Sequence, residues 1–436
     1  MLLILTAVSI ATLTGENGVL TRANKAKEET QITTAEEKVK VEVVGSYDNS
    51  GKISIENLNK NLENVTGLTS GLPIEFLPAT VEVDGYEIII GDNGNVSTVI
   101  RILEYQTEDT KPYLPSGNFK LLENTSLENG LVITDGTNNW VWIEVPKSIY
   151  LTAKSETDYE EIENDMETYT KTLVSRNGYE DVWYDGEGNA AENATNLNDT
   201  TGCGLTYEEY HSLKKYMLKS VYKNGGFWIG QYEAGSNIYP ATPKNDTRTV
   251  LIQKDLYPYN YISCSNAQIK SSKLNSGNYI SSLMFGIQWD LILKHLEVKG
   301  KVPREEIVTT SIKWGNYSRS EFFIDNGKYS IKPYNANSFI DYSEDTKGYV
   351  EDKYKFDRVP ILLTTGARIL NSKMNIYDLA GNLFEWTLEK SSVQYSPSTI
   401  RGGYFNNLGD DYPASSRYFN STSVEDIFNG FRPALY

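Results

Sequence analysis

Cysteine and histidine, the residue types that often act as nucleophiles, proton carriers or metal ligands, are scarce in this sequence. The 436 residues include two cysteines, Cys203 and Cys264, and two histidines, His211 and His295. The cysteines do not have the Cys-x-x-Cys spacing of a zinc ribbon or a thioredoxin-like redox site. They could form one disulfide or stay free and buried, and the sequence leaves both alternatives open. Each histidine lies in a segment with a helical pattern, where a single histidine is usually structural.

A segment near the C-terminus has the residue types of a contact surface. Between residues 404 and 428, aromatic residues are interspersed with Asn, Ser, Asp and Gly, and lysine is absent. The apolar positions follow neither the period of a strand nor that of a helix, so neither a buried strand nor a helix explains them. Rigid aromatic side chains beside small, adaptable polar side chains are typical of antibody paratopes.

The composition of the whole chain narrows the classes of partner. Lysine and arginine number 41 against 58 aspartate and glutamate residues, which gives a formal net charge of −17. This balance argues against a nucleic-acid partner and against binding to an anionic membrane surface, because both need a basic surface. Hydrophobic residues make up 39% of the chain, which predicts a globular protein, and the length predicts two or three domains. The 31 tyrosines outnumber the 13 phenylalanines and 7 tryptophans together, which indicates exposed aromatic surface.

The N-terminal part of the chain predicts a helix. Residues 2–13 are apolar but too few to span a membrane, and no basic stretch or Ala-x-Ala site marks a signal peptide. Apolar residues then recur at helical spacing at positions 32, 35, 39 and 43. Residues 5–23 resemble the second half of the N-terminus of type IV pilin-like proteins from Gram-positive bacteria. The alternative is an ordinary amphipathic helix.

That resemblance implies a domain order for the first part of the chain. Residues 1–45 are expected to be a pilin-like N-terminal helix, truncated because the processing site and the first turns are missing. Strand patterns between residues 81 and 100 predict a small α/β pilin-like head over 46–105. A stretch rich in Thr, Asp, Pro and Gly predicts a linker over 106–118.

The rest of the chain, residues 119–436, contains five sequence blocks in order. They are the strand around Trp140, the run 227–233, the run 376–387, the Arg-Gly-Gly-Tyr block at 401–404 and the C-terminal run 429–436. These blocks resemble the formylglycine-generating-enzyme subfamily of the C-type lectin fold, also called the sulfatase-modifying factor domain. The expected fold class is therefore α+β, with a large lectin-fold domain rich in loops. Arg401 and Arg432 are expected to donate hydrogen bonds to loop carbonyls.

The same resemblance bears on catalysis and metals. True members of the family bind copper through paired cysteines after the Arg-Gly-Gly block, but residues 401–436 contain neither cysteine nor histidine. Iron-dependent relatives use three histidines, which two isolated histidines do not provide. No enzyme activity, copper or iron is therefore expected, and an oxidase is the least favoured hypothesis.

A structural calcium site is a further expectation from the resemblance. The matching positions, Asp378, Gly381, Leu383 and Glu385, would donate side-chain and main-chain oxygens, which Ca²⁺ prefers. In the alternative interpretation, Asp378 caps a turn and Glu385 pairs with an arginine.

The segment 401–436 is also similar to the variable region of target proteins of diversity-generating retroelements, which often end in Gly-Phe-Arg-Pro-Ala-Leu. Randomised adenines turn Asn codons into codons for Tyr, Phe, Ser, Asp and others, whereas Glu425 does not arise in this way and would be fixed. The expected ligand contacts are Tyr404, Phe405, Asn407, Asp410, Tyr412, Tyr418, Phe419, Asp426 and Phe428. The alternative is an ordinary set of lectin-fold loops without diversification.

These observations favour a bacterial surface protein that displays a lectin-fold binding domain. Its ligand would be a protein or a glycan on another cell or particle, and other pilin-like subunits are further expected partners. The expected location is extracellular, at the cell surface or on a pilus. The alternative is a structural filament subunit whose large domain is not diversified.

Overall fold

The structure is a computed structural model, and it divides the chain into two compact units. It describes residues 19–238, 247–274, 279–318, 320, 323–324, 327–331, 348–349 and 360–436. The N-terminal unit comprises Met1–Ile100 with Ser276–Tyr279, and the C-terminal unit comprises Arg101–Asn275 with Ile280–Tyr436. The apolar stretch 2–13 lies outside the described residues. None of the described helices combines the length and the apolar character that crossing a membrane requires.

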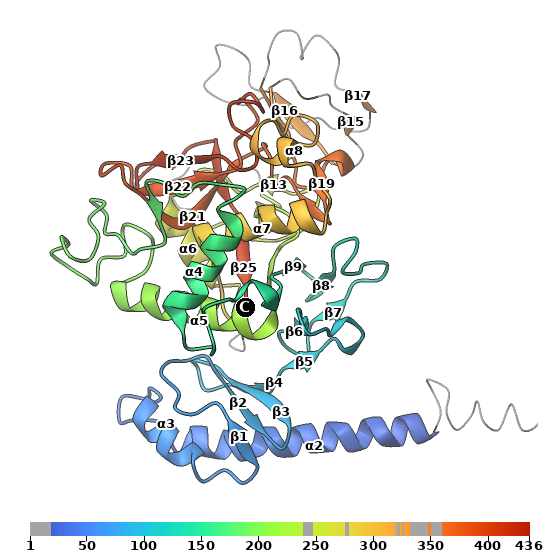
Figure 1. The fold of residues 1–436 in the computed structure, drawn as a ribbon, viewed down its shortest axis with the longest axis vertical. Coiled ribbons are helices and arrows are strands. Elements are labelled where there is room, and N and C mark those ends of the chain that lie inside the picture. Colours follow the sequence, from blue (N-terminus) through green and yellow to red (C-terminus); the bar gives the residue numbers. More distant parts are fainter. Residues whose placement is uncertain are drawn as a thin grey trace, which may run out of the picture. The chain divides into compact units, whose positions relative to one another are not determined.

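The N-terminal unit packs a long helix on a small antiparallel sheet (Figure 1). Its elements are α2 (Val19–Val44), α3 (Ile55–Leu62), β1 (Leu68–Ser70), β2 (Ala79–Val83), β3 (Tyr86–Ile90) and β4 (Val96–Thr98), with strand order β1-β2-β3-β4. The strand patterns that the sequence shows between residues 81 and 100 correspond to β2, β3 and β4. Ala35, Val39 and Val43 of α2 are buried against α3 and the sheet, since their spacing places them on one face of the helix.

The first turns of α2 do not take part in this core. Every side chain from Arg22 to Gln31 is exposed, and burial begins only at Ala35. The residues of these first turns are mostly polar, so this part of the helix presents polar side chains around its whole circumference.

The C-terminal unit contains a six-stranded antiparallel sheet. Its order is β14 (Ser281–Leu283), β25 (Pro433–Leu435), β11 (Gly226–Gly230), β9 (Asn139–Glu144), β8 (Val132–Thr134) and β7 (Lys120–Leu121). The C-terminal strand β25 thus lies inside the sheet, between β14 and β11. Trp142 and Trp228 are register partners in β9 and β11, and their ring centroids are 4.9 Å apart.

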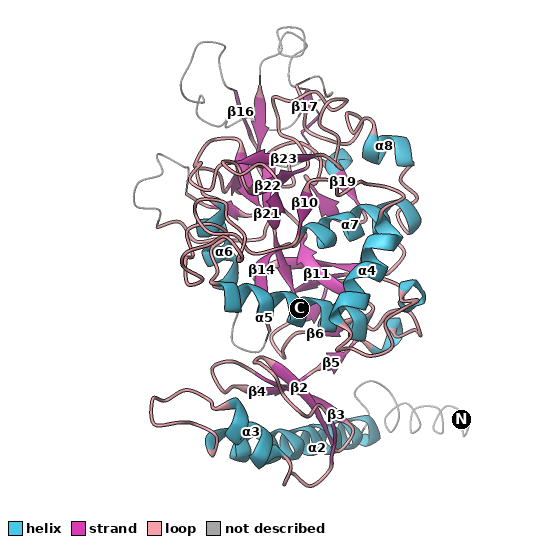
Figure 2. Ribbon diagram, turned by 60° about the vertical axis from the view of Figure 1, so that its left-hand side comes forward, coloured by secondary structure: helices cyan, strands magenta, loops and turns pink. Residues whose placement is uncertain are grey.

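Helices pack on this sheet and on one another (Figures 1 and 2). They are α4 (Tyr159–Thr170), α5 (Tyr207–Asn224), α6 (Cys264–Ser272), α7 (Gly286–Val298) and α8 (Arg304–Val308). Helix α5 contacts β11, α7 contacts β9, and α4 packs on both α5 and α7. A capping box of Thr206 and Glu209 begins α5, and Gly225 in the left-handed conformation ends it.

A second sheet carries most of the C-terminal segment. Its order is β10 (Tyr179–Glu180), β21 (Phe384–Ser391), β22 (Ser398–Arg401) and β23 (Arg417–Asn420), and β24 (Asn429–Phe431) pairs in parallel with β21. In register, Arg401 of β22 lies opposite Glu385 of β21 and Arg417 of β23. Strand β23 is the last strand of this row, so it lies at an edge of the sheet.

The remaining elements are short. They are β5 (Ile100–Arg101), β6 (Tyr113–Leu114), β12 (Gly235–Ser236), β13 (Tyr257–Pro258), β15 (Phe323–Ile324), β16 (Tyr329–Ile331), β17 (Gly348–Tyr349), β18 (Ile361–Leu363), β19 (Ser372–Lys373), β20 (Ile376–Tyr377) and the 3₁₀ turns Leu103–Tyr105, Lys147–Ile149 and Ile369–Asn371. The chain is therefore a mixed α+β protein, as the sequence predicted.

The segment 106–118, which we expected to be a linker, packs into the C-terminal unit. Thr110 is buried; its hydroxyl donates to the Gly225 carbonyl over 3.0 Å and accepts the Trp142 indole N–H over 2.8 Å.

Candidate functional site

Seven aromatic rings from separate parts of the C-terminal segment and β21 converge on one cluster, which we call the aromatic cluster. Its members are Phe384, Tyr404, Phe405, Tyr412, Tyr418, Phe419 and Phe428. The ring centroids of Tyr404 and Phe428 are 4.7 Å apart, and those of Tyr418 and Phe419 are 4.8 Å apart. All six aromatic residues that the sequence predicted as ligand contacts belong to this cluster. Phe384, which the sequence placed only in a family block, contacts three of them.

The cluster has a buried base and a partly exposed surface. Phe405 is fully buried and packs with Leu362 and Leu383. We expected Phe405 to contact a ligand, but the structure places it in the core, where it supports Tyr404 and Phe428. Tyr418 is 41% exposed. The other predicted aromatic contacts are half-buried.

The polar residues predicted as contacts mainly hold the turns of the segment. The Asn407 side-chain oxygen accepts the Tyr404 N–H over 3.1 Å. Asp426 accepts the N–H groups of Phe428 and Asn429 over 2.9 and 3.1 Å, and burial raises its pKa. Asp410 is exposed and accepts the Thr310 hydroxyl. These bonds fix the backbone that carries the aromatic rings.

Below the cluster, three arginines and three carboxylates form what we call the buried ion network. Its members are Arg176, Asp181, Asp290, Glu389, Arg401 and Arg417. Arg401 contacts Asp290 at 3.0 Å, and the side chains of both are fully buried. Arg417 contacts Glu389 at 3.0 Å and also pairs with Asp290.

The network ties the strands of the second sheet to α7 and to the end of α4. Asp290 lies on α7, and Asp181 accepts the N–H groups of Gly286 and Ile287 at the start of that helix over 2.6 and 2.9 Å. A side chain at Gly286 would not fit, because its Cβ would lie 2.2 Å from the Glu389 carboxylate. Burial lowers the pKa of Arg401 to about 10, which leaves the guanidinium charged at neutral pH.

Arg401 also fulfils the role that the sequence predicted for it. Its Nε donates to the Ser416 carbonyl over 2.9 Å, which fixes the loop that precedes β23. The ion pairs of Arg401 with α7 and β21 were not foreseen, because their carboxylates are distant in sequence and lie in no motif.

The second predicted arginine, Arg432, has the same double role. It donates to the carbonyls of Gly230 and Tyr377 over 2.9 and 2.7 Å, and its guanidinium pairs with both oxygens of Glu385 at 2.7 and 3.0 Å. Arg432 and Glu385 are fully buried and Tyr377 is half-buried, and through these bonds Arg432 joins β11, β20 and β21.

Of the four residues that we expected to bind calcium, the two carboxylates accept hydrogen bonds from other groups of the protein. Both oxygens of Glu385 are bonded to Arg432, and the buried Asp378 accepts the Gly366 N–H over 2.6 Å. Leu383 is buried in the core. Gly381 has a φ of +74° and approaches Asn316 so closely that a Cβ would lie 2.2 Å from the Asn316 carbonyl oxygen. No group of three metal-binding side chains exists among the described residues. The contacts match the alternative interpretation, in which Asp378 holds a turn and Glu385 pairs with an arginine.

Glu233 adds a third buried carboxyl to Asp378 and Glu385. One of its oxygens accepts the Asn382 side-chain N–H, and the other has no hydrogen-bond partner among the described residues. Burial, followed by the charges of Asp378 and Glu385, raises the pKa of Glu233 well above its usual value. Burial also raises the pKa of Asp378 to about 6. The sequence alone gave no sign that the charges of Asp378 and Glu385 act on a buried Glu233.

Both cysteines and His295 are buried, whereas His211 is exposed. Cys203 and Cys264 are free and fully buried, and burial raises their thiol pKa values to about 12 and about 11. The structure thus selects the free, buried alternative. His295 accepts the Glu144 N–H over 3.2 Å, and burial lowers its pKa to about 4, so it is neutral at pH 7. His211 packs on the Tyr207 ring at 4.3 Å.

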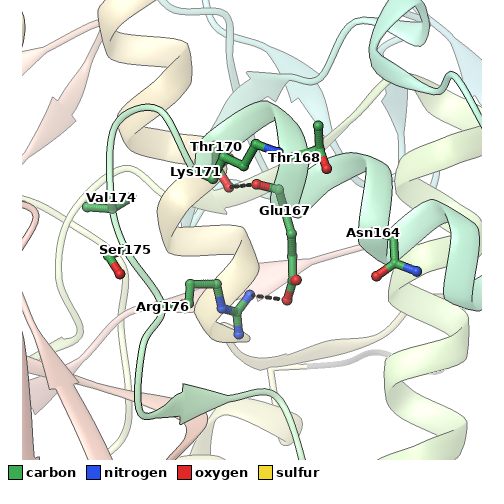
Figure 3. Close-up of a pocket in the computed structure, with 8 residues that line it drawn as sticks. All are labelled: Asn164, Glu167, Thr168, Thr170, Lys171, Val174, Ser175 and Arg176. Carbon is green, nitrogen blue, oxygen red and sulfur yellow. Dashed lines mark hydrogen bonds and ion pairs between the residues drawn. The ribbon is translucent and has the colours of Figure 1, made fainter.

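A pocket of about 420 Å³ lies at the end of α4 (Figure 3). It is lined by Asn164, Glu167, Thr168, Thr170, Lys171, Val174, Ser175 and Arg176. Figure 3 shows the Arg176 guanidinium turned towards Glu167, to which it is paired at 3.5 Å. None of these residues was predicted, and none belongs to the aromatic cluster.

Comparison with known proteins finds similarity among solved structures. No protein-family profile matches the chain, and no curated protein matches it in sequence. Among solved structures, the chain is similar to Treponema denticola variable protein 1, with 14% sequence identity and a TM-score of 0.26. The similarity covers 48% of this chain and 84% of that protein.

Proposed function

We propose that the C-terminal unit is a binding domain that takes a protein or glycan ligand at the aromatic cluster. The observation that carries the proposal is the convergence of six separately placed aromatic residues on one partly exposed cluster. Aromatic side chains bury a large area while losing few rotamers, so they suit a contact surface. Tyr418, with 41% of its surface exposed, is the most accessible of the predicted aromatic contacts.

The support beneath the cluster suits a surface whose residues can change. The buried ion network holds β22 and β23 through the ion pairs of Arg401 and Arg417. Neither these ion pairs nor the hydrogen bond from Arg401 to the Ser416 carbonyl involves the side chains of Tyr412, Tyr418 or Phe419. Substitution at those three positions therefore leaves the framework of the segment intact. Such a separation is what a diversified binding surface needs.

On this basis the chain is a variable protein of a diversity-generating retroelement, with a C-type lectin fold of the formylglycine-generating-enzyme type. The sequence blocks and the residue types of segment 401–436 support this assignment. Arg417 is then a fixed position, because its charge is buried and paired, whereas Tyr412, Tyr418 and Phe419 are variable positions. A template repeat and a reverse transcriptase gene beside the coding sequence would support the assignment, and their absence would overturn it.

The N-terminal unit would display the binding domain. A helix whose first turns project polar side chains on all sides, as α2 does from Arg22 to Gln31, is suited to contacts outside its own unit. A pilin-like anchor at the cell surface or on a pilus would use this part of the helix, with other pilin-like subunits as neighbours. The location that follows from the proposal is extracellular.

The proposed role is not catalytic. The raised thiol pKa values of Cys203 and Cys264 favour the protonated form, which neither attacks a substrate nor ligates a metal well. His295 is buried, its Nδ1 accepts the Glu144 N–H of β9, and burial lowers its pKa to about 4, so it is neutral at pH 7.

The experiment that tests the proposal is capture of the full chain on an array of cell-surface proteins and glycans. Binding that is lost in Tyr418→Ala and Tyr412→Ala, with an unchanged melting temperature, is the expected result. A matched control is Tyr395→Ala, which removes another tyrosine, 86% exposed, from outside the cluster. Binding that survives both cluster substitutions would refute the proposal.

A further inference from the structure

The exposed charges of the segment around the aromatic cluster all have one sign. Asp410, Asp411 and Glu425 are exposed, and Asp426 is half-buried. Between residues 402 and 431 there is no lysine and a single arginine, Arg417. The surface charge of this segment is therefore negative unless Arg417 offsets it.

Arg417 does not offset it. Its side chain is 5% exposed and is bound to Asp290 and Glu389 in the buried ion network. That network contains three arginines and three carboxylates, so it adds no net positive charge from below. The segment thus presents carboxylates alone as its charged groups.

These carboxylates border the aromatic rings. Asp410 and Asp411 directly precede Tyr412, and Asp426 accepts the N–H of Phe428. The charges of Asp411 and Asp426 are also close enough to disfavour ionisation of Tyr412 and Tyr404, although burial is the larger cause of their raised pKa values. Ring faces and carboxylates therefore share one surface.

We propose that the partner is a protein segment that presents lysine or arginine side chains to this surface, an inference that rests on the proposed function. A cation gains from the face of an aromatic ring and from a nearby carboxylate at the same time. A partner with acidic groups, such as an acidic peptide or a sulfated or sialylated glycan, is repelled by the same carboxylates.

The test uses the full chain and two synthetic peptides that differ only in having lysine or glutamate at the same positions among Tyr, Leu and Ser. Binding is measured by fluorescence polarisation at about 10 mM and about 1 M salt. Over this range the Debye length, which sets the reach of charge attraction in water, falls from about 30 Å to about 3 Å. The lysine peptide is expected to bind at least about tenfold more tightly than the glutamate peptide at low salt, which is about 1.4 kcal/mol.

Two triple variants separate a local effect from the overall charge of −17. Asp410→Asn with Asp411→Asn and Glu425→Gln is expected to remove the preference for lysine. The control variant neutralises three exposed carboxylates outside the C-terminal segment, by Glu104→Gln, Glu108→Gln and Glu123→Gln. It is expected to keep the preference for the lysine peptide.

The outcomes distinguish this inference from the proposed function. Equal loss in both triple variants, or no binding of the lysine peptide, would overturn the basic partner. Binding of an array ligand that needs Tyr418 but not the three carboxylates would overturn the basic partner and leave the proposed function standing. If the Tyr418→Ala and Tyr412→Ala variants bind the array ligands as well as the wild type does, the proposed function itself is overturned.

Discussion

Arg401 and Arg417 lie directly opposite each other in the adjacent strands β22 and β23, and one carboxylate, Asp290 of α7, pairs with both. Two like charges in neighbouring positions of a sheet would repel each other. Asp290 and Glu389 compensate both positive charges, and the ion pairs with Asp290 connect the sheet to α7. The edge strand β23, which carries part of the proposed binding surface, is thus held by the ion pairs of Arg417 with buried carboxylates.

Removing one partner of this bridge should destabilise the C-terminal unit. Asp290→Ala leaves two buried arginines short of a counter-charge, and we expect a loss of about 3–5 kcal/mol of unfolding free energy. All seven tryptophans lie in the C-terminal unit, so denaturation followed by tryptophan fluorescence reports on that unit. The control is Lys219→Ala, which breaks a more exposed pair with Glu156 and should cost less than about 1 kcal/mol. Equal costs for the two variants would contradict the prediction.

The aromatic cluster should divide into supporting and contacting residues. Phe405→Ala opens a cavity in the core and should cost about 3–5 kcal/mol. Tyr418→Ala removes a side chain that is 41% exposed and should shift the melting temperature only slightly. Thermal unfolding of the two variants side by side checks this. A large destabilisation by Tyr418→Ala would mark Tyr418 as core and weaken the proposed function.

The buried carboxyls should make the stability of the C-terminal unit fall as the pH rises through weakly acidic values. Burial raises the pKa of Asp378 to about 6 in the folded state. The folded state therefore holds this proton more tightly than the unfolded state, whose pKa is about 3.9. The contribution of Asp378 is fully present below pH of about 4 and is lost by about pH 6, and it amounts to about 3 kcal/mol.

The variant that checks this is Asp378→Asn. Asparagine tolerates the positive φ of 57° at this position and keeps an oxygen for the Gly366 N–H. Its unfolding free energy should depend less on pH between 4 and 6 than that of the wild type, and it should be the more stable protein at pH 7. An unchanged pH profile would show that Asp378 does not carry the effect.

Adding Ca²⁺ after chelation should leave the melting temperature unchanged. Both oxygens of Glu385 already accept bonds from Arg432, so a calcium ion would have to displace a buried guanidinium. Isothermal titration and thermal unfolding with and without Ca²⁺ measure this directly. Saturable heat that disappears in Glu385→Gln would contradict the prediction and restore the calcium site that the sequence suggested.

The sequence by itself predicted a helix and strands in the N-terminal unit and singled out the aromatic residues of the C-terminal segment. The spacing of Ala35, Val39 and Val43 defines one face of a helix, and the composition of residues 404–428 predicts a contact surface. Both signals are local, because they depend on neighbours along the chain. The scarcity of cysteine and histidine is likewise visible without a fold.

Only the tertiary structure decided which of those residues face outward and what supports them. Phe405 and Tyr418 are alike in sequence terms, yet one is fully buried and the other 41% exposed. Arg401 pairs with Asp290, and the charge of Asp378 acts on Glu233, although these residues lie in segments that are far apart in the chain. Burial and charge pairing are properties of such long-range packing, so no local pattern encodes them. The residue types of the proposed surface could therefore be read from the sequence, whereas the exposure of each side chain and its ion pairs depended on the fold.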